Sequence, residues 1–279
     1  MDDGTFRKRK PVPRHMDPYR SREESSEADA DRSEGIVEGR NAVIEALRAG
    51  RPIDKIYIAK GETDASLGHI ASKARQAGTV VVEADRRKLD AMSVTKNHQG
   101  VIALASVKAY VSIEDILQTA KDRNEQPLII VCDEISDPHN LGAIIRTAEC
   151  TGAHGIIIPK RRSAGMTAVV SKTSAGAVEY LAVARVSNLT AALGELKKAG
   201  VWVYGADADG ESHIWQTDLT GPAALVIGSE GAGLSRLILE NCDFRVRIPM
   251  VGKISSLNAS VSASVIMYEA LRQRSMSGK

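Results

Sequence analysis

Four short and nearly continuous apolar runs in the second half of the chain constrain its fold more than any other feature. They cover residues 128–131, 156–158, 201–204 and 223–227. Apolar residues without polar alternation indicate strands buried on both faces, as in a parallel sheet covered by helices. Segments with helical spacing that can supply this cover lie at 141–150, 189–199 and 234–240. We therefore predict an open, doubly wound α/β domain over residues 127–279.

A smaller α/β unit is predicted before this sheet, over residues 35–107. One helix carries Val43 and Leu47, a second carries Leu67 and Ile70, and each ends at a glycine, which is the expected residue just past a helix. Strands are expected at 56–58, 80–82 and 101–105. The two domains are joined by a predicted linker helix within 108–126. Its start is marked by Ser112 and Asp115, which have the spacing of a capping box.

Residues 1–34 have the composition of a flexible tail. They contain no Leu or Ile and three prolines, and they change from a basic stretch to an acidic one. Such a segment has too few apolar side chains to form a core. We expect it to remain unfolded and to contact RNA phosphates if the protein binds RNA.

Composition excludes some classes of protein and leaves others open. The three cysteines lie far apart and form no CxxC or Cys/His cluster, which argues against disulfides and metal sites. No apolar run approaches the ~20 residues that cross a bilayer, so we expect a cytoplasmic protein without membrane contact. The net charge of +2 does not identify a nucleic-acid partner. Local basic clusters are either solvated surface or RNA contacts: 86–88, 160–162, and Arg245 with Arg247 and Lys253.

Polar and glycine-rich segments follow the predicted strands at 133–146, 228–233 and 248–258. Ligands of parallel sheets bind beyond the carboxyl ends of the strands, so these segments should meet in one crevice. The glycine order of the second segment, GxxGxG, is neither the dinucleotide fingerprint nor a P-loop. This difference argues against NAD binding and nucleotide hydrolysis.

Each polar residue of these segments also has a plain structural interpretation. We expect Pro138 to block helix formation and Asn140 to cap the helix that carries Arg146. Glu230 can interact with the positive end of a helix dipole. Ser255, Ser256 and Asn258 can be turn or cap residues. From the residues alone, these interpretations stay open beside a catalytic one.

Taken together, the segments resemble a known family. Residues 137–148, 226–234, and 248–250 with 255–260 are similar, in this order, to the three motifs of the SpoU (TrmH) family of RNA 2′-O-ribose methyltransferases of the SPOUT class. Residues 97–101 resemble the end of the L30e-like substrate-binding domain found in the subgroup that methylates 23S ribosomal RNA, the RlmB type. The resemblance extends over about residues 35–275.

The resemblance implies a fold and a set of site residues that the patterns do not. Apolar patterning favours an unknotted, Rossmann-like sheet, whereas the family implies a trefoil-knotted domain and a homodimer whose sites use both chains. It implies S-adenosyl-L-methionine as the cofactor. Its implied catalytic residues are Asn140, Arg146, Glu230, Ser256 and Asn258. Its implied cofactor contacts are Gly228, Ile248, Met250, Ser256 and Leu257.

The expected reaction is methyl transfer to a ribose 2′-hydroxyl. The RlmB-type resemblance points to a guanosine in the peptidyl-transferase loop of 23S ribosomal RNA as the target. Because an arginine has a pKa above about 12, we expect Arg146 to position a phosphate and not to act as a base. In this hypothesis Glu230 orients Arg146, while Asn140 and Asn258 fix the ribose. Alternatives are methylation of transfer RNA or another ribosomal site, and a non-catalytic RNA-binding or ribosome-assembly protein.

Overall fold

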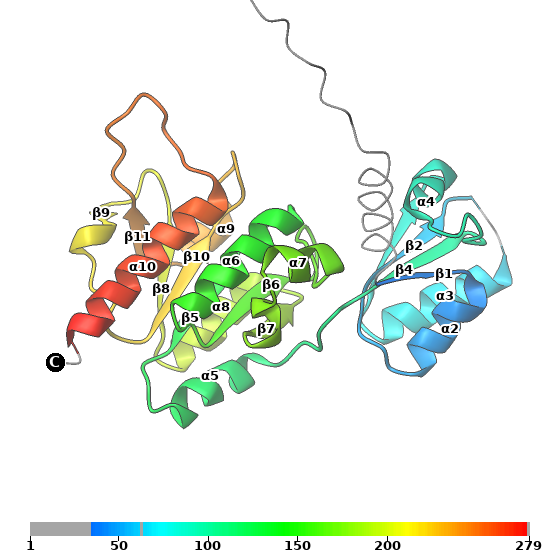
Figure 1. Cartoon of the computed structure of the whole chain (residues 1–279), viewed down its shortest axis with the longest axis horizontal. Helices are drawn as coiled ribbons and strands as arrows, with labels where there is room; N and C mark the ends of the chain where they lie inside the picture. The colour runs from blue at the N-terminus through cyan, green and yellow to red at the C-terminus, as the bar shows by residue number, and fades with distance from the viewer. Residues whose placement is uncertain (1–34, 62–63, 278–279) are drawn as a thin grey trace, which may run out of the picture.

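The computed structural model describes residues 35–61 and 64–277, so the predicted tail at 1–34 lies outside the described residues. The chain forms two sheets joined by a linker (Figure 1). Within the described ranges, no helix is both long and apolar enough to cross a bilayer.

The smaller sheet has the strand order β1-β4-β2-β3. Only β2 and β3 are parallel, and β4 pairs antiparallel with β1 and β2. In chain order its elements are β1 (Ile36–Glu38), α2 (Arg40–Arg48), β2 (Ile53–Ala59), α3 (Ala65–Gln76), β3 (Val80–Ala84), α4 (Arg86–Met92) and β4 (Val101–Ala105). The predicted helices and strands of this unit are present, and β1 and α4 are additions. β1 was not predicted because it is only three residues long and half-buried, so no apolar run marks it in the sequence.

The linker helix α5 (Ile113–Asp122) starts at the predicted capping box. The Ser112 hydroxyl accepts a hydrogen bond from the Asp115 amide at 3.1 Å, and the Asp115 carboxylate accepts one from the Ser112 amide at 2.9 Å. Ile113 and Ile116 are buried against α8 and the larger sheet. The helix is therefore part of the core of the larger domain and not a free connection.

The larger sheet is wholly parallel, with the order β7-β6-β5-β10-β8-β11-β9. Its strands are β5 (Leu128–Cys132), β6 (Gly155–Pro159), β7 (Ala182–Val186), β8 (Trp202–Ala206), β9 (Ser212–His213), β10 (Ala223–Ile227) and β11 (Phe244–Arg247). Its helices are α6 (Pro138–Cys150), α7 (Ala168–Thr173), α8 (Leu189–Lys198), α9 (Arg236–Glu240) and α10 (Ala259–Ser277), with 3-10 turns η1 (Ala177–Glu179) and η2 (Ile214–Gln216).

Both faces of this sheet are buried, as the apolar runs predict. Leu128 and Ile130 of β5 belong to the core under α6 and α10, whereas Ile129 and Val131 belong to the opposite core under α5 and α8. β7 and β11 are additions to the prediction, because charged residues interrupt them: Arg185 in β7, and Arg245 with Arg247 in β11.

The Rossmann-like strand order favoured by patterning alone is wrong. β10 lies between β5 and β8, so the central strand comes late in the chain. The apolar runs of β8 and β10 are both buried at their centres, and nothing in their pattern sets which one pairs with β5. This order places the segments after β5 and β10 side by side.

Candidate active site

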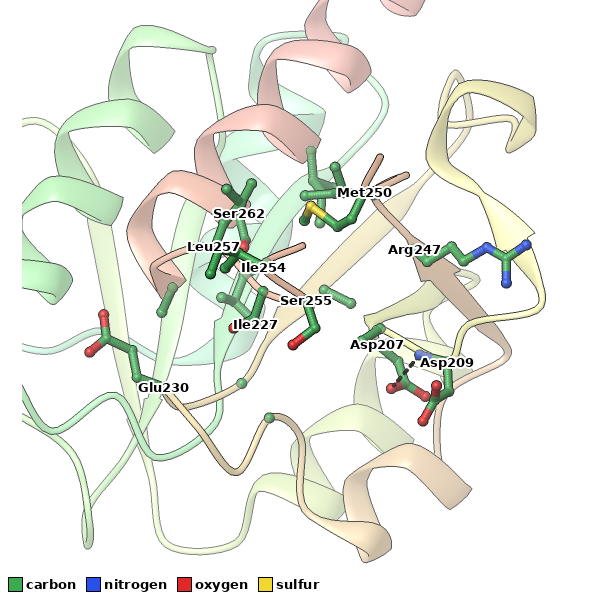
Figure 2. A pocket seen from close by; sticks show the side chains of 18 of the residues that line it. Asp207, Asp209, Ile227, Glu230, Arg247, Met250, Ile254, Ser255, Leu257 and Ser262 are labelled. Carbon is green, nitrogen blue, oxygen red and sulfur yellow. Dashed lines mark hydrogen bonds between the residues drawn. The ribbon is translucent and has the colours of Figure 1, made fainter. Parts of the chain in front are cut away.

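A cavity of about 930 Å³ lies at the carboxyl edge of the larger sheet (Figure 2). Its walls come from the segments that follow β8, β10 and β11 and from the start of α10. All five residues expected to contact the cofactor line it: Gly228, Ile248, Met250, Ser256 and Leu257. The volume lies within the ~300–1,000 Å³ that is usual for sites of small ligands.

The turn after β10 is closed on itself, and this closure explains its first glycine. The amide of Ser229 donates to the carbonyl of Gly233, and the amide of Gly233 donates to the carbonyl of Ser229, each at 3.0 Å. A β-carbon on Gly228 would lie 2.2 Å from the Gly233 carbonyl carbon. Only glycine therefore fits at Gly228, and the turn brings its backbone to the wall of the cavity.

Asn140, Glu230 and Asn258 form one hydrogen-bonded group, which we call the site network. The Asn140 side-chain amide donates to the Glu230 carboxylate at 3.0 Å, and the Asn258 amide donates to the Asn140 carbonyl oxygen at 3.0 Å. Asn258 also donates to Glu230. Residues 118 positions apart in the chain thus meet at the edge of the cavity, as the three polar segments predict.

Two of the cap and turn expectations need correction. Pro138 does not block the helix but is its first residue, because its fixed φ suits that position and its missing N–H has no partner there. The cap is Asp137, whose carboxylate accepts from the His139 amide at 3.0 Å. Asn140 therefore lies inside the first turn of α6, and its amide is available to Glu230.

Asn258 is both a helix cap and a member of the site network. Its side-chain oxygen accepts from the amides of Ser260 and Val261, at 2.9 and 3.3 Å, which is the geometry of an N-cap for α10. Its amide group meanwhile contacts Asn140 and Glu230. Both ends of this side chain are therefore held, so its orientation is fixed before any substrate arrives.

Arg146 and Ser256 lie outside the site network. Both side chains are exposed. Within the described part of the chain, Arg146 has no hydrogen-bond or ion-pair partner. The hypothesis that Glu230 orients Arg146 is wrong for a single chain, because the Glu230 carboxylate receives the two asparagines instead. Ser256 lines the cavity beside Leu257.

The sequence reasoning missed a group of polar residues on the far wall of the cavity. Asp207 and Asp209 follow β8, and Arg247 ends β11, where it contacts the His213 ring at 3.0 Å. Asp207 pairs with Arg245 at 3.3 Å. The rule that sheet ligands bind beyond the carboxyl ends of strands would have found Asp207 and Asp209, since they directly follow an apolar run.

Thiol chemistry has no support at this site. Burial, with a smaller contribution from Asp133, raises the pKa of the Cys132 thiol to about 12, so it stays protonated. In residues 35–61 and 64–277, no group of His, Cys, Asp and Glu side chains is arranged to hold a metal ion.

The fold and the site together define a class: an α/β enzyme that binds a small cofactor in a loop-built cavity and carries a separate domain in front. Two family models match the chain. Residues 127–268 match the SpoU rRNA methylase family, and residues 36–111 match the substrate-binding domain of RNA 2′-O ribose methyltransferases.

Relatives and solved structures agree with these matches. The chain is 46% identical over 243 residues to a TrmH family tRNA/rRNA methyltransferase of Bacillus subtilis, covering 87% of this chain and 97% of that one. It is similar to the SpoU methyltransferase AviRb of Streptomyces viridochromogenes in complex with AdoMet, with a TM-score of 0.55, 28% identity, and coverage of 86% of this chain and 90% of that one. An AdoMet-bound rRNA methyltransferase of Sinorhizobium meliloti matches with a TM-score of 0.52 and 26% identity, over 89% and 90% of the two chains.

The chain belongs to the SpoU rRNA methylase family. It is an RNA methyltransferase that uses S-adenosylmethionine. The fold class implied by the resemblance, a knotted SPOUT domain behind a small α/β domain, is confirmed by these structural neighbours.

The residues present fit this cofactor. Gly228 lets the turn at 228–233 close at the wall of the cavity, and Ile248, Met250 and Leu257 give the cavity an apolar lining. Backbone groups of the turn at 228–233 and the carboxylates of Asp207 and Asp209 give the lining polar groups of the kind that the charged and ribose portions of this cofactor need.

Proposed function

We propose that the protein methylates the ribose 2′-hydroxyl of one guanosine in the peptidyl-transferase loop of 23S ribosomal RNA, in the cytoplasm. The observation that carries the proposal is the site network, a fixed group of two amides and a carboxylate at the edge of the cofactor cavity. A ribose hydroxyl needs such groups, because its oxygen must be held in line with the methyl donor at about 3 Å. RNA is implied because the acceptor hydroxyl is absent from DNA.

The cofactor supplies a methyl group that is already activated by a positively charged sulfur. The protein therefore has to bind, orient and assist proton removal. Asn140 and Asn258 present hydrogen-bonding groups to the ribose, and Glu230 keeps both amides aligned. Five of the residues that line the cavity hold the cofactor: Gly228, Ile248, Met250, Ser256 and Leu257.

Arg146 lies on the same helix as Asn140 of the site network, and we assign it to an RNA phosphate. Its guanidinium is planar and suits a two-pronged contact with a phosphate. Because it is exposed and separate from Glu230 within one chain, it is available to a substrate or to a second copy of the chain.

A homodimer through α6 and α10 is part of the proposal. Val261 and Tyr268 are 46% and 53% exposed on α10, and their spacing puts them on the same face as Ser264. The Ser264 hydroxyl contacts Thr147 of α6 at 3.0 Å, next to Arg146 in sequence. An exposed apolar stripe beside a free cation supports an interface at which Arg146 serves the partner's site.

The coverage of the structural neighbours favours ribosomal over transfer RNA. The rRNA methyltransferase of Sinorhizobium meliloti matches 89% of this chain, including the small domain. A TrmH/SpoU tRNA modifying enzyme of A. aeolicus matches 59% of this chain, with 30% identity and a TM-score of 0.51. The match to the ribosomal enzyme therefore includes the small domain, whereas the match to the tRNA modifying enzyme covers a shorter part of the chain.

The test is methyl transfer from labelled S-adenosylmethionine to unmodified 23S, 16S and transfer RNA, followed by mapping of the 2′-O-methyl groups. We expect one labelled guanosine in the 23S transcript. Label in transfer RNA or at a different ribosomal position would show that the proposed substrate is wrong and would identify the actual one. Cofactor binding without label in any transcript would favour the non-catalytic RNA-binding alternative.

A further inference from the structure

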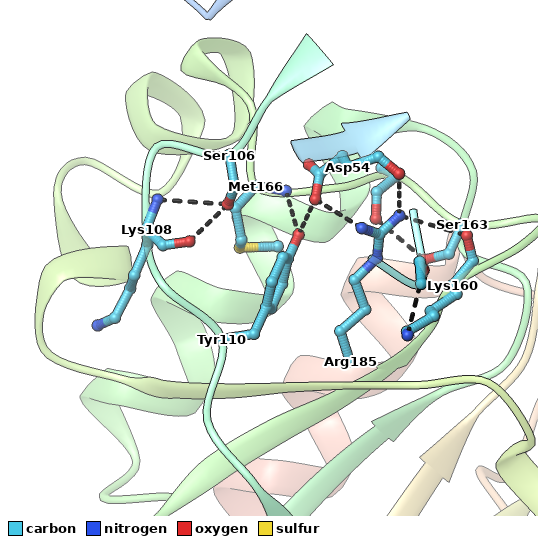
Figure 3. A network of polar contacts seen from close by, with 10 residues as sticks. Asp54, Ser106, Lys108, Tyr110, Lys160, Ser163, Met166 and Arg185 are labelled. Carbon is cyan, nitrogen blue, oxygen red and sulfur yellow. Dashed lines mark hydrogen bonds and ion pairs between the residues drawn. The ribbon is translucent and has the colours of Figure 1, made fainter. Parts of the chain in front are cut away.

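The two domains meet at a buried ion pair, shown in Figure 3. Arg185 of β7 donates to the Asp54 carboxylate of β2 at 2.8 Å and to the Asp54 backbone carbonyl at 2.9 Å. The two side chains are only 8% and 4% exposed. The linker residue Tyr110 donates its hydroxyl hydrogen to Asp54 and accepts from the Met166 amide at 3.1 Å. We call Asp54, Tyr110 and Arg185 the domain junction.

The surroundings of the domain junction are shaped to fit it. A β-carbon on Gly165 would lie 2.0 Å from a carboxylate oxygen of Asp54, so only glycine allows this approach. Burial raises the pKa of Tyr110, which keeps its hydroxyl protonated and able to donate. Burial also raises the pKa of Asp54, against the opposing effects of Arg185 and Tyr110. The arginine and the tyrosine thus offset only part of the effect of burial on the carboxylate.

The linker is held along the larger domain as well. The amide of Val107 donates to the Met166 carbonyl at 2.7 Å, and the amide of Val111 donates to the Val183 carbonyl at 2.9 Å. The Lys108 ammonium contacts the Val178 carbonyl at 2.6 Å. Together with the ion pair, these contacts give the small domain a fixed orientation where a free tether would let it rotate.

The junction lies at the same edge of the sheet as the active site. Arg185 is near the carboxyl end of β7, and all strands of this sheet are parallel. β6 and β5 separate β7 from β10, so three spacings of about 4.8 Å put the carboxyl end of β7 roughly 14 Å from that of β10, which the turn at 228–233 follows. The loop after β6, between them, carries the exposed Arg161 and Arg162.

We propose that Asp54, Tyr110 and Arg185 are positioning residues that set the offset between the RNA-binding domain and the methyl donor, and so determine which nucleotide is methylated. The inference rests on the proposed function. RNA that is bound by the small domain crosses the basic loop after β6 and then reaches the active site. The distance along the RNA between the bound segment and the methylated nucleotide is therefore fixed. When the junction opens, the same RNA still binds, but its target sugar is no longer held opposite the donor.

The test compares Tyr110→Phe, Asp54→Asn and Arg185→Lys with the unmodified protein. A matched control is Arg236→Met, which breaks an exposed ion pair with Glu240 in the same domain. Small-angle scattering measures the separation of the domains. Calorimetry measures S-adenosylmethionine binding, and methyl mapping along 23S transcripts gives both rate and position.

We expect the junction variants to bind the cofactor and RNA within about twofold of the unmodified protein. Scattering should show a more extended molecule. Methylation of the main nucleotide should fall about tenfold, with methyl groups appearing at neighbouring nucleotides. Methylation should fall least in Arg185→Lys, because this variant retains the charge. The rate and position of methylation by Arg236→Met should match those of the unmodified protein.

An opened junction with unchanged rate at one unchanged nucleotide would overturn the positioning role and leave the proposed function intact. Scattering curves identical to that of the unmodified protein would overturn the claim that the junction fixes the domains. If the unmodified protein methylates no RNA, the proposed function fails and the positioning role fails with it. Tyr110→Phe keeps the ion pair and the ring, so it tests the inference even if the charge variants do not fold.

Discussion

The site network and the domain junction are both polar groups that join distant parts of the chain, yet their surroundings differ. The junction is closed, with its arginine and carboxylate 8% and 4% exposed. The site network borders an open cavity, and Glu230 is exposed. A buried ion pair that already has its partners can hold a structure together, whereas polar groups that face a cavity can also bind a ligand. Because Asn140 is also buried, the open cavity beside Glu230, more than burial of each side chain, separates the two roles.

The largest effect on stability is expected at the domain junction. Arg185→Met leaves the Asp54 carboxylate buried without its cation, which should lower the free energy of unfolding by about 3–5 kcal/mol. Chemical denaturation monitored by circular dichroism measures this loss. A change below about 1 kcal/mol would mean that the junction is far more hydrated than its burial indicates, and the contrast with the site network would disappear.

The largest effect on catalysis is expected at the site network. Glu230→Gln keeps the size of the side chain but can no longer accept two amides as a carboxylate, so kcat should fall about 10²–10³-fold. The melting temperature should change little, because the residue is exposed. Single-turnover methylation and a thermal melt separate the two quantities. A large loss of stability with normal turnover would reverse the assignment of the two regions.

A smaller effect is expected at Arg146. Arg146→Lys retains the charge but loses the two-pronged geometry, so turnover should fall about tenfold with a modest loss of RNA affinity. The measurement is kcat and KM for RNA at saturating S-adenosylmethionine. Unchanged turnover with unchanged RNA affinity would contradict a phosphate clamp and place Arg146 with the solvated surface residues.

The smallest effect is expected between the two regions, on the loop after β6. The double variant Arg161→Ala with Arg162→Ala should weaken RNA binding a few-fold and reduce the slope of log affinity against log salt by about one for each lost phosphate contact. Arg162 pairs with Glu134 at 2.9 Å, so its share should be the smaller one. An unchanged salt slope would remove the loop from the RNA path.

Local patterns predicted the elements that follow simple rules. The buried strands β5, β6, β8 and β10 were predicted because apolar residues occupy both faces, and α5 because Ser112 and Asp115 satisfy each other locally. β11 was missed because Arg245 and Arg247 interrupt its apolar pattern in a strand near the edge of the sheet. Asn140 was assigned to a cap because the sequence does not say that the helix starts two residues earlier, at Pro138.

The sequence by itself determined the buried strands, most of the helices and the polar loops, and its ordered motifs determined the family. Only the tertiary structure decided that β10 lies beside β5, that Glu230 receives Asn140 and Asn258 and not Arg146, and that Asp54 meets Arg185. The physical reason is the distance along the sequence between the residues that interact. Helix caps and apolar periodicity depend on neighbours a few residues apart, whereas strand order and buried ion pairs depend on contacts between residues 90 to 131 positions apart.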